Sequence, residues 1–161
     1  MDLYPLFLTL HNLARWLVVI FAILALVRAW RGWLRKGDWT RLDDRAGIFF
    51  TSALDTQVLL GLILYFAYSP YAQLTANNFS GAMADPATRF FGLEHWLWML
   101  AATVGAHVGR AVSRRQPDPL KKHRLVAIFF TAAVLLILLA IPWPFLANTG
   151  RPLFRLFGIT F

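Results

Sequence analysis

The sequence predicts an all-α integral membrane protein: a four-helix bundle with its N-terminus and C-terminus outside the membrane. The composition is the first reason, since 58% of the 161 residues are hydrophobic and 16% are aromatic. With a mean hydropathy of +0.55, this chain differs from ordinary soluble domains. The second reason is that the apolar residues form four long runs. Each run is near or above the roughly 20 residues that cross about 30 Å of hydrocarbon.

We expect these runs to be four transmembrane helices of a single domain, residues 1–161. Only helices and closed barrels satisfy their backbone in lipid, and continuous apolar runs differ from the alternating pattern of barrel strands. The predicted spans are residues 6–29, 46–68, 90–112 and 123–146. Pro142 and Pro144 are expected to end the fourth helix, because proline has no backbone N–H and the residue before it avoids helical geometry.

The net charge of +8 is concentrated in two of the three connections. The second connection holds only Arg89, and the C-terminal segment holds Arg151 and Arg155. By the positive-inside rule, the first and third connections lie in the cytoplasm, where they are expected to meet anionic lipid headgroups. The cations in or beside these two connections are Arg28, Arg31, Arg35, Lys36, Arg41 and Arg45, then Arg110, Arg114, Arg115, Lys121, Lys122 and Arg124.

Several classes of function are excluded by composition. The chain has no cysteine, which rules out disulfides, cysteine-attached haem, thiolate metal sites and iron–sulfur clusters. The clustering of positive charge at one membrane side argues against a nucleic-acid partner. No Lys or Arg precedes the first apolar run, so we expect that run to be retained as a helix and not removed as a secretion signal.

Two segments outside the spans are expected to pack on something. The connection over residues 69–89 is longer than most helix–helix connections. The tail Phe154–Phe161 is apolar but too short to span a bilayer, so we expect it on a partner or at the membrane interface.

Polar residues within the spans carry the functional information. His11 and His95 each lie five residues from the outer end of a predicted span, roughly 8 Å below the surface of the hydrocarbon core. Two imidazoles at one level can be the axial ligands of a haem iron, or they can simply be hydrogen-bonded inside the bundle. Glu94 points about 100° away from His95, so a metal site formed by all three side chains is awkward.

Two charges are expected near the middle of the bilayer. Arg15 descends from the outer side and Asp55 rises from the cytoplasmic side, each by about 14 Å. We therefore predict a structural ion pair between Arg15 and Asp55, since either charge alone would be intolerable in hydrocarbon. Arg15 also shares a helix face with His11, from which it could instead contact a haem propionate or a carboxylate ligand.

His107 is not expected to hold a second haem. His95 and His107 are twelve residues apart, which places them about 120° out of register on a helix. We expect His107 to be hydrogen-bonded beside Arg110.

Four segments resemble small four-helix bacterial membrane proteins of the cytochrome b-like type, in the style of cytochrome b561 or the copper-resistance D proteins. They are residues 11–16 (HNLARW), 59–66 (LLGLILYF), 89–95 (RFFGLEH) and 141–144 (IPWP). The resemblance covers nearly the whole chain, and it implies haem b within the bundle and electron transfer at the membrane. Many relatives are expected to have histidine where this chain has Asp55, which would remove or alter a site that pairs that position with His107.

Together these features predict a b-type haem-binding membrane electron-transfer subunit, with one haem b, rather than a stand-alone enzyme. The haem iron would be held by His11 and His95, with Arg15 nearby. Quinone, other membrane subunits and the lipid bilayer are the expected partners, in respiratory or photosynthetic electron flow at the bacterial inner membrane. The alternative is a cofactor-free accessory subunit, whose polar residues join helices within a larger membrane complex.

Overall fold

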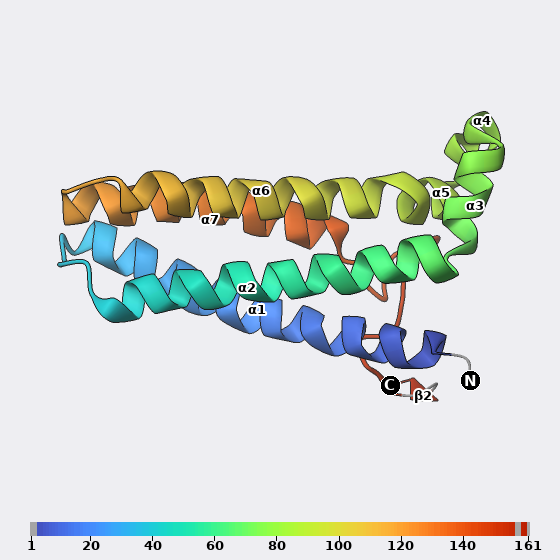
Figure 1. The fold of residues 1–161 in the computed structure, drawn as a ribbon, viewed down its shortest axis with the longest axis horizontal. Helices are drawn as coiled ribbons and strands as arrows, with labels where there is room; N and C mark the ends of the chain where they lie inside the picture. Colours follow the sequence, from blue (N-terminus) through green and yellow to red (C-terminus); the bar gives the residue numbers. More distant parts are fainter. Residues whose placement is uncertain (1–2, 157–158, 161) are drawn as a thin grey trace.

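The computed structural model describes residues 3–156 and 159–160, and four long helices dominate it (Figure 1). Shorter π-helical segments extend two of these helices at the end of the molecule where the first helix begins. The long helices are α1 (Tyr4–Leu34), α2 (Arg41–Ile63), α6 (His95–Arg114) and α7 (Pro119–Ala140), and the π-helical segments are η1 (Leu64–Tyr68) and η2 (Phe90–Glu94).

The long helices pack side by side in the order α1, α2, α6, α7, with α7 closing back on α1. Helices α1 and α6 therefore lie diagonally across the bundle. Small residues bring the backbones close, among them Ala25 of α1 and Ala106 of α6, which are almost fully buried. Phe50 and Phe130 fill the space between α2 and α7 with an edge-to-face contact at 5.0 Å between ring centroids.

The outer surface of the bundle is strongly apolar. Large side chains such as Ile20 and Leu139 are more than half exposed, at 56% and 63%. Three helices are long and apolar enough to cross a membrane: Tyr4–Leu34, Arg41–Tyr68 and Pro119–Ala140. The third predicted span, 90–112, forms η2 and most of α6 and is not among them. His95, His107 and Arg110 are spread along α6, so it lacks a continuous apolar stretch as long as those of the other three.

The helices extend beyond the predicted spans at Tyr4, Leu34, Arg41 and Arg114, and both ends of the fourth helix differ from the prediction. The fourth helix begins at Pro119, with Asp118 as its N-cap, where the carboxylate accepts from the backbone N–H of Leu120 at 2.9 Å. It ends at Ala140 and not at 146, because Pro142 and Pro144 cannot continue the hydrogen-bond ladder.

The long connection between η1 and η2 is itself helical. It consists of α3 (Pro70–Asn77), α4 (Phe79–Ala84) and α5 (Pro86–Arg89). Each begins at a polar N-cap: Ser69, Asn78 and Asp85. As expected, the connection packs on something, which is η2: Gly92 lies so close to Thr75 that a Cβ at this position would stand 2.1 Å from the threonine hydroxyl.

The C-terminal tail packs on α1 of its own chain. The Phe154 ring stacks on Trp16 with centroids 5.0 Å apart, and the Trp16 indole donates to the Leu153 carbonyl at 3.2 Å. The tail then forms a short antiparallel pair, β1 (Arg155–Leu156) with β2 (Ile159–Thr160). Residues 157, 158 and 161 of the predicted tail lie outside the described residues.

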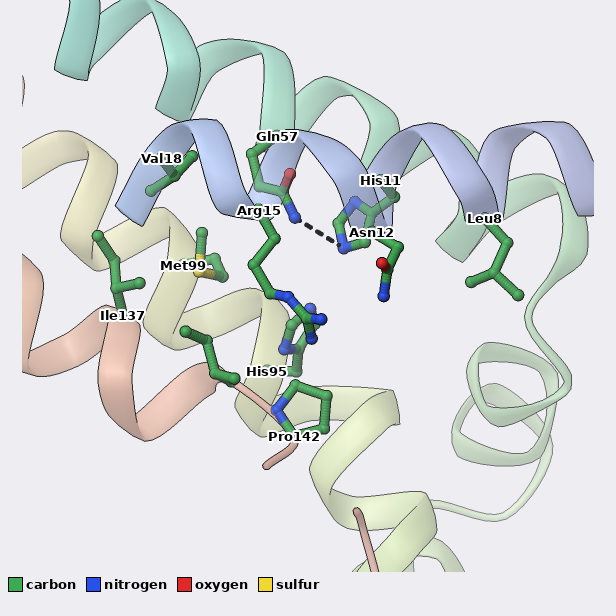
Figure 2. A pocket seen from close by; sticks show the side chains of 11 residues that line it. Leu8, His11, Asn12, Arg15, Val18, Gln57, His95, Met99, Ile137 and Pro142 are labelled. Atoms are coloured by element: carbon green, nitrogen blue, oxygen red, sulfur yellow. Dashed lines mark hydrogen bonds between the residues drawn. The ribbon is translucent and has the colours of Figure 1, made fainter. Parts of the chain in front are cut away.

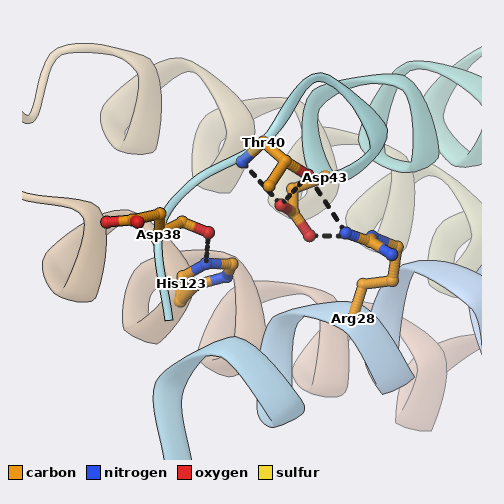
Figure 3. Close-up of polar contacts among 5 residues, drawn as sticks. All are labelled: Arg28, Asp38, Thr40, Asp43 and His123. Atoms are coloured by element: carbon orange, nitrogen blue, oxygen red, sulfur yellow. Dashed lines mark hydrogen bonds and ion pairs between the residues drawn. The ribbon is translucent and has the colours of Figure 1, made fainter. Parts of the chain in front are cut away.

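At the opposite end, a polar network fixes the connection between α1 and α2 (Figure 3). Asp43 accepts from Arg28 at 2.8 Å and from the backbone N–H of Thr40 at 2.7 Å, which caps α2. Nε2 of His123, on α7, lies 3.3 Å from the Asp38 carbonyl oxygen. The His123 ring is 1% exposed and lies against Gly32, where a Cβ would stand 2.2 Å from it. We call this end, with residues 35–40 and 115–118, the basic end.

Candidate functional site

His11 and His95 face each other across the bundle (Figure 2). Their ring centroids are 6.2 Å apart, and the ring planes meet at 67°. They come from α1 and α6, the two diagonal helices, so both side chains point toward the bundle axis. The structure therefore brings the two predicted ligands together.

His95 is held by the backbone of α7. Its Nδ1 lies 2.7 Å from the carbonyl oxygen of Ala140. A carbonyl oxygen only accepts, so Nδ1 carries the proton and Nε2 keeps a free lone pair. A backbone hydrogen bond of this kind commonly orients a metal-binding histidine.

His11 is only partly satisfied. Its Nε2 lies 3.1 Å from the Gln57 side-chain amide nitrogen on α2. Nδ1 of His11 and Oε1 of Gln57 are buried without a hydrogen-bond partner among the described residues. Gly61, one turn after Gln57, lets the ring lie against α2, because a Cβ there would stand 3.2 Å from Cε1 of His11. An orphaned ring nitrogen inside a helix bundle is costly, and it marks this position as a candidate ligand site.

A cavity of about 70 Å³ lies beside the two rings. Met99, one turn after His95 on α6, lines it together with Arg15 and residues of α1 and α7 (Figure 2). This volume corresponds to about two water molecules at liquid density and is well below the roughly 300–1,000 Å³ of typical cofactor pockets. The remaining lining residues are Leu8, Asn12, Val18, Gln57, Ile137, Ile141 and Pro142.

The spacing of the two histidine rings suits a haem iron, but the volume of the cavity does not suit the porphyrin. Two imidazoles about 2 Å from one metal ion on opposite sides place their ring centroids about 6 Å apart, close to the spacing of His11 and His95. A cavity of about 70 Å³ does not hold a porphyrin plate, so haem would require the surrounding side chains to move apart. The His11–Gln57 contact would also have to give way if Nε2 became the ligand.

Arg15 and Asp55 do not form the predicted ion pair. The Arg15 guanidinium donates to the Leu153 carbonyl of the C-terminal tail. Asp55 instead lies 2.7 Å from Nε2 of His107, with the two side chains 53% and 47% exposed. Arg15 and Asp55 do lie in long helices, as the apolar runs predicted, but a depth estimate cannot fix the directions of side chains around the helix axes. The cytochrome b-like resemblance implies a histidine at position 55, where this chain has aspartate. Asp55 contacts His107, the residue with which that histidine would form a site.

Glu94 takes no part in the histidine pair. Its carboxylate accepts from Arg89 at 2.9 Å at the surface of η2. Within residues 3–156 and 159–160, no three side chains of histidine, cysteine, aspartate or glutamate form a group that could hold a metal ion.

Sequence reasoning assigned no role to three contributors to the site: Gln57, Met99 and the Ala140 carbonyl. Gln57 stands out as a polar residue within the second apolar run, and helical spacing could have found Met99, which lies one turn after His95 on the same face. The Ala140 carbonyl had a subtler signal. In a continuing helix it would pair with the N–H of residue 144, but that residue is proline.

The chain was compared with known proteins. No family model, curated protein or solved structure matches it.

Proposed function

We propose that this chain is a b-type haem-binding subunit of a membrane electron-transfer complex, with His11 and His95 as axial ligands. The observation that carries the proposal is the pair of rings at 6.2 Å, one with a backbone-oriented Nδ1 and the other with an orphaned Nδ1. Iron between the two rings would satisfy a ring nitrogen of each histidine. The resemblance of residues 11–16 and 89–95 to cytochrome b-like proteins points the same way.

We further propose that all four long helices cross the membrane, with α6 as the fourth span. Thr103 and Ser113 are buried, His95 and His107 contact α7 and α2, and the 20 residues of α6 are close to the 22 of α7. The unequal distribution of Lys and Arg supports a cytoplasmic basic end and external termini, in a bacterial inner membrane.

Haem held by two imidazoles exchanges single electrons and has no open position for substrate. In this role, His95 keeps its Nε2 lone pair directed away from the Ala140 carbonyl. Arg15 lies at the same cavity, where a guanidinium can pair with a propionate. Quinol is the proposed lipid-phase electron partner, and other membrane subunits complete the path.

A reduced-minus-oxidised visible spectrum tests this function. Protein purified from a haem-replete host should show b-type bands at one haem per chain. His11→Ala and His95→Ala should each abolish or shift the bands, whereas His107→Ala, which alters the histidine bound to Asp55, should leave them unchanged. Absence of haem bands at stoichiometric protein yield would reject the proposal.

The size of the cavity favours a second candidate, a cofactor-free accessory subunit. About 70 Å³ accommodates water but not a macrocycle. The hydrogen bonds of His95 and Gln57 already join α6 to α7 and α1 to α2. In that case the purified chain is colourless, and mild solubilisation of native membranes recovers it in a larger complex. Since both candidates belong to a larger complex, it is the visible spectrum that separates them.

A further inference from the structure

A second and much larger hollow lies at the basic end, between the start of α2 and the α6–α7 connection. Its volume is about 640 Å³, within the range of ligand-binding clefts. Arg41 and Arg45 line one side, and Arg114 and Lys122 line the other. The cleft belongs to none of the features used above for the histidine pair.

The charges in this cleft are unbalanced. Its single carboxylate, Asp44, already has Arg110 at 3.8 Å. Within the described part of the chain, none of the four cations that line the cleft forms an ion pair. Cations gathered in a concavity without counter-charges repel one another and raise the local concentration of anions.

The wall of the cleft is a built structure. Trp39 and Thr40, which line it, belong to the connection fixed by Asp43 and by the His123–Asp38 contact (Figure 3). The Trp39 ring also packs on the His123 ring with centroids 4.8 Å apart. The cations of the cleft therefore surround a connection that hydrogen bonds hold in place.

The position of the cleft indicates what kind of anion it receives. Ile48 lines the cleft, one turn beyond Arg45 along α2, and the neighbouring Phe49 is 48% exposed. A ligand with a phosphate among the cations and an apolar chain along α2 would match both surfaces. Basic pockets between transmembrane helices at the cytoplasmic side bind lipid headgroups of this chemistry.

We propose that the cleft lined by Arg41, Arg45, Arg114 and Lys122 binds the phosphate group of an anionic phospholipid. The proposal rests on the membrane placement given above and is independent of haem. An uncharged or zwitterionic lipid lacks the net charge that the four cations require, and free phosphate lacks the chain that would follow Ile48.

Binding of short-chain phosphatidylglycerol to the full chain in non-ionic detergent tests this site. Arg45→Gln/Arg114→Gln should weaken binding about thirtyfold at physiological salt, since each cation beside an anionic headgroup contributes about a factor of five. The matched control is Arg31→Gln/Arg35→Gln, which removes the same charge from the same end but outside the cleft. It should retain the wild-type affinity. If the first double variant does not fold, Lys122→Gln alone should weaken binding about fivefold.

Two further arms identify the source of the phosphate. Short-chain phosphatidylcholine should bind much more weakly than phosphatidylglycerol, and inorganic phosphate should compete only poorly. Equal weakening by the control variant, or equal binding of phosphatidylcholine, would overturn the site. If inorganic phosphate binds as tightly as the lipid and needs Arg45 and Arg114, the occupant is a soluble phosphate and the lipid assignment is wrong. Neither result depends on the haem spectrum.

Discussion

Nδ1 of His95 lies 2.7 Å from the carbonyl oxygen of Ala140, the last residue of α7. This carbonyl is available because residue 144, four positions on, is proline and has no N–H. The same arrangement recurs two residues earlier. In a continuing helix the Leu138 carbonyl would pair with the N–H of residue 142, which is also proline, and it accepts instead from the Trp143 indole at 2.9 Å. The two prolines thus leave two helix carbonyls free for side-chain donors, and one of them orients the proposed ligand.

The first prediction concerns the tautomer of His95. Because Ala140 offers only an acceptor, the neutral ring should carry its proton on Nδ1 and leave Nε2 unprotonated. Nitrogen-15 NMR of histidine-labelled protein in micelles distinguishes the two ring nitrogens, and His95→Gln identifies the signal. A proton found on Nε2 at neutral pH would contradict the arrangement.

The second prediction concerns Gln57, which is 5% exposed. Gln57→Leu removes the partner of His11 Nε2 and should lower the free energy of unfolding by about 1–3 kcal/mol, the cost of an unsatisfied buried group. Denaturant titration of the apoprotein in micelles measures this. The neighbouring Thr56 bonds only within its own helix, to Ser52, so Thr56→Val should be close to neutral. Equal losses in both variants would argue against the His11–Gln57 contact.

The third prediction compares two helical glycines. Gly32→Ala would place a Cβ 2.2 Å from the buried His123 ring and should destabilise the protein by about 1–3 kcal/mol. Gly105→Ala meets nothing within 4 Å and should stabilise α6 by up to about 1 kcal/mol. Thermal unfolding of the two variants should therefore shift in opposite directions. A neutral Gly32→Ala would mean that His123 does not occupy the space against α1.

The fourth prediction concerns pH and the connection between η1 and η2. Hydrogen bonds from the Thr88 hydroxyl and backbone N–H lower the pKa of Asp85. A group with a lowered folded pKa stabilises the fold above its unfolded pKa, and this contribution is lost as the pH falls through the folded pKa. The Asp85 carboxyl carbon should thus titrate below the ordinary aspartate range, and Thr88→Val should raise its midpoint. A midpoint that does not respond to Thr88→Val would exclude this cause.

Hydrophobic runs predicted the long helices of this chain well, because length and apolar content act along the sequence. The meeting of His11 and His95 also followed, since their positions along the predicted helices bring them to the same level of the bundle. The directions in which side chains point around each helix axis could not be predicted in this way. Depth alone allowed Arg15 to pair with Asp55, whereas the C-terminal tail takes Arg15 through a backbone carbonyl far away in the sequence.

The last prediction tests that exchange of partners by double-mutant cycles. Arg15 and Asp55 share no contact, so the effects of Arg15→Ala and Asp55→Ala on unfolding should add within about 0.3–0.5 kcal/mol. Asp55→Ala and His107→Ala should instead couple, by about 0.2–1 kcal/mol, because their side chains lie 2.7 Å apart but are about half exposed. Unfolding by denaturant in micelles gives both cycles. Since Asp55 belongs to both, its own loss of stability cancels, and the cycle with the larger coupling identifies its true partner. Coupling found only with Arg15 would restore the midplane ion pair and leave His107 without its acceptor.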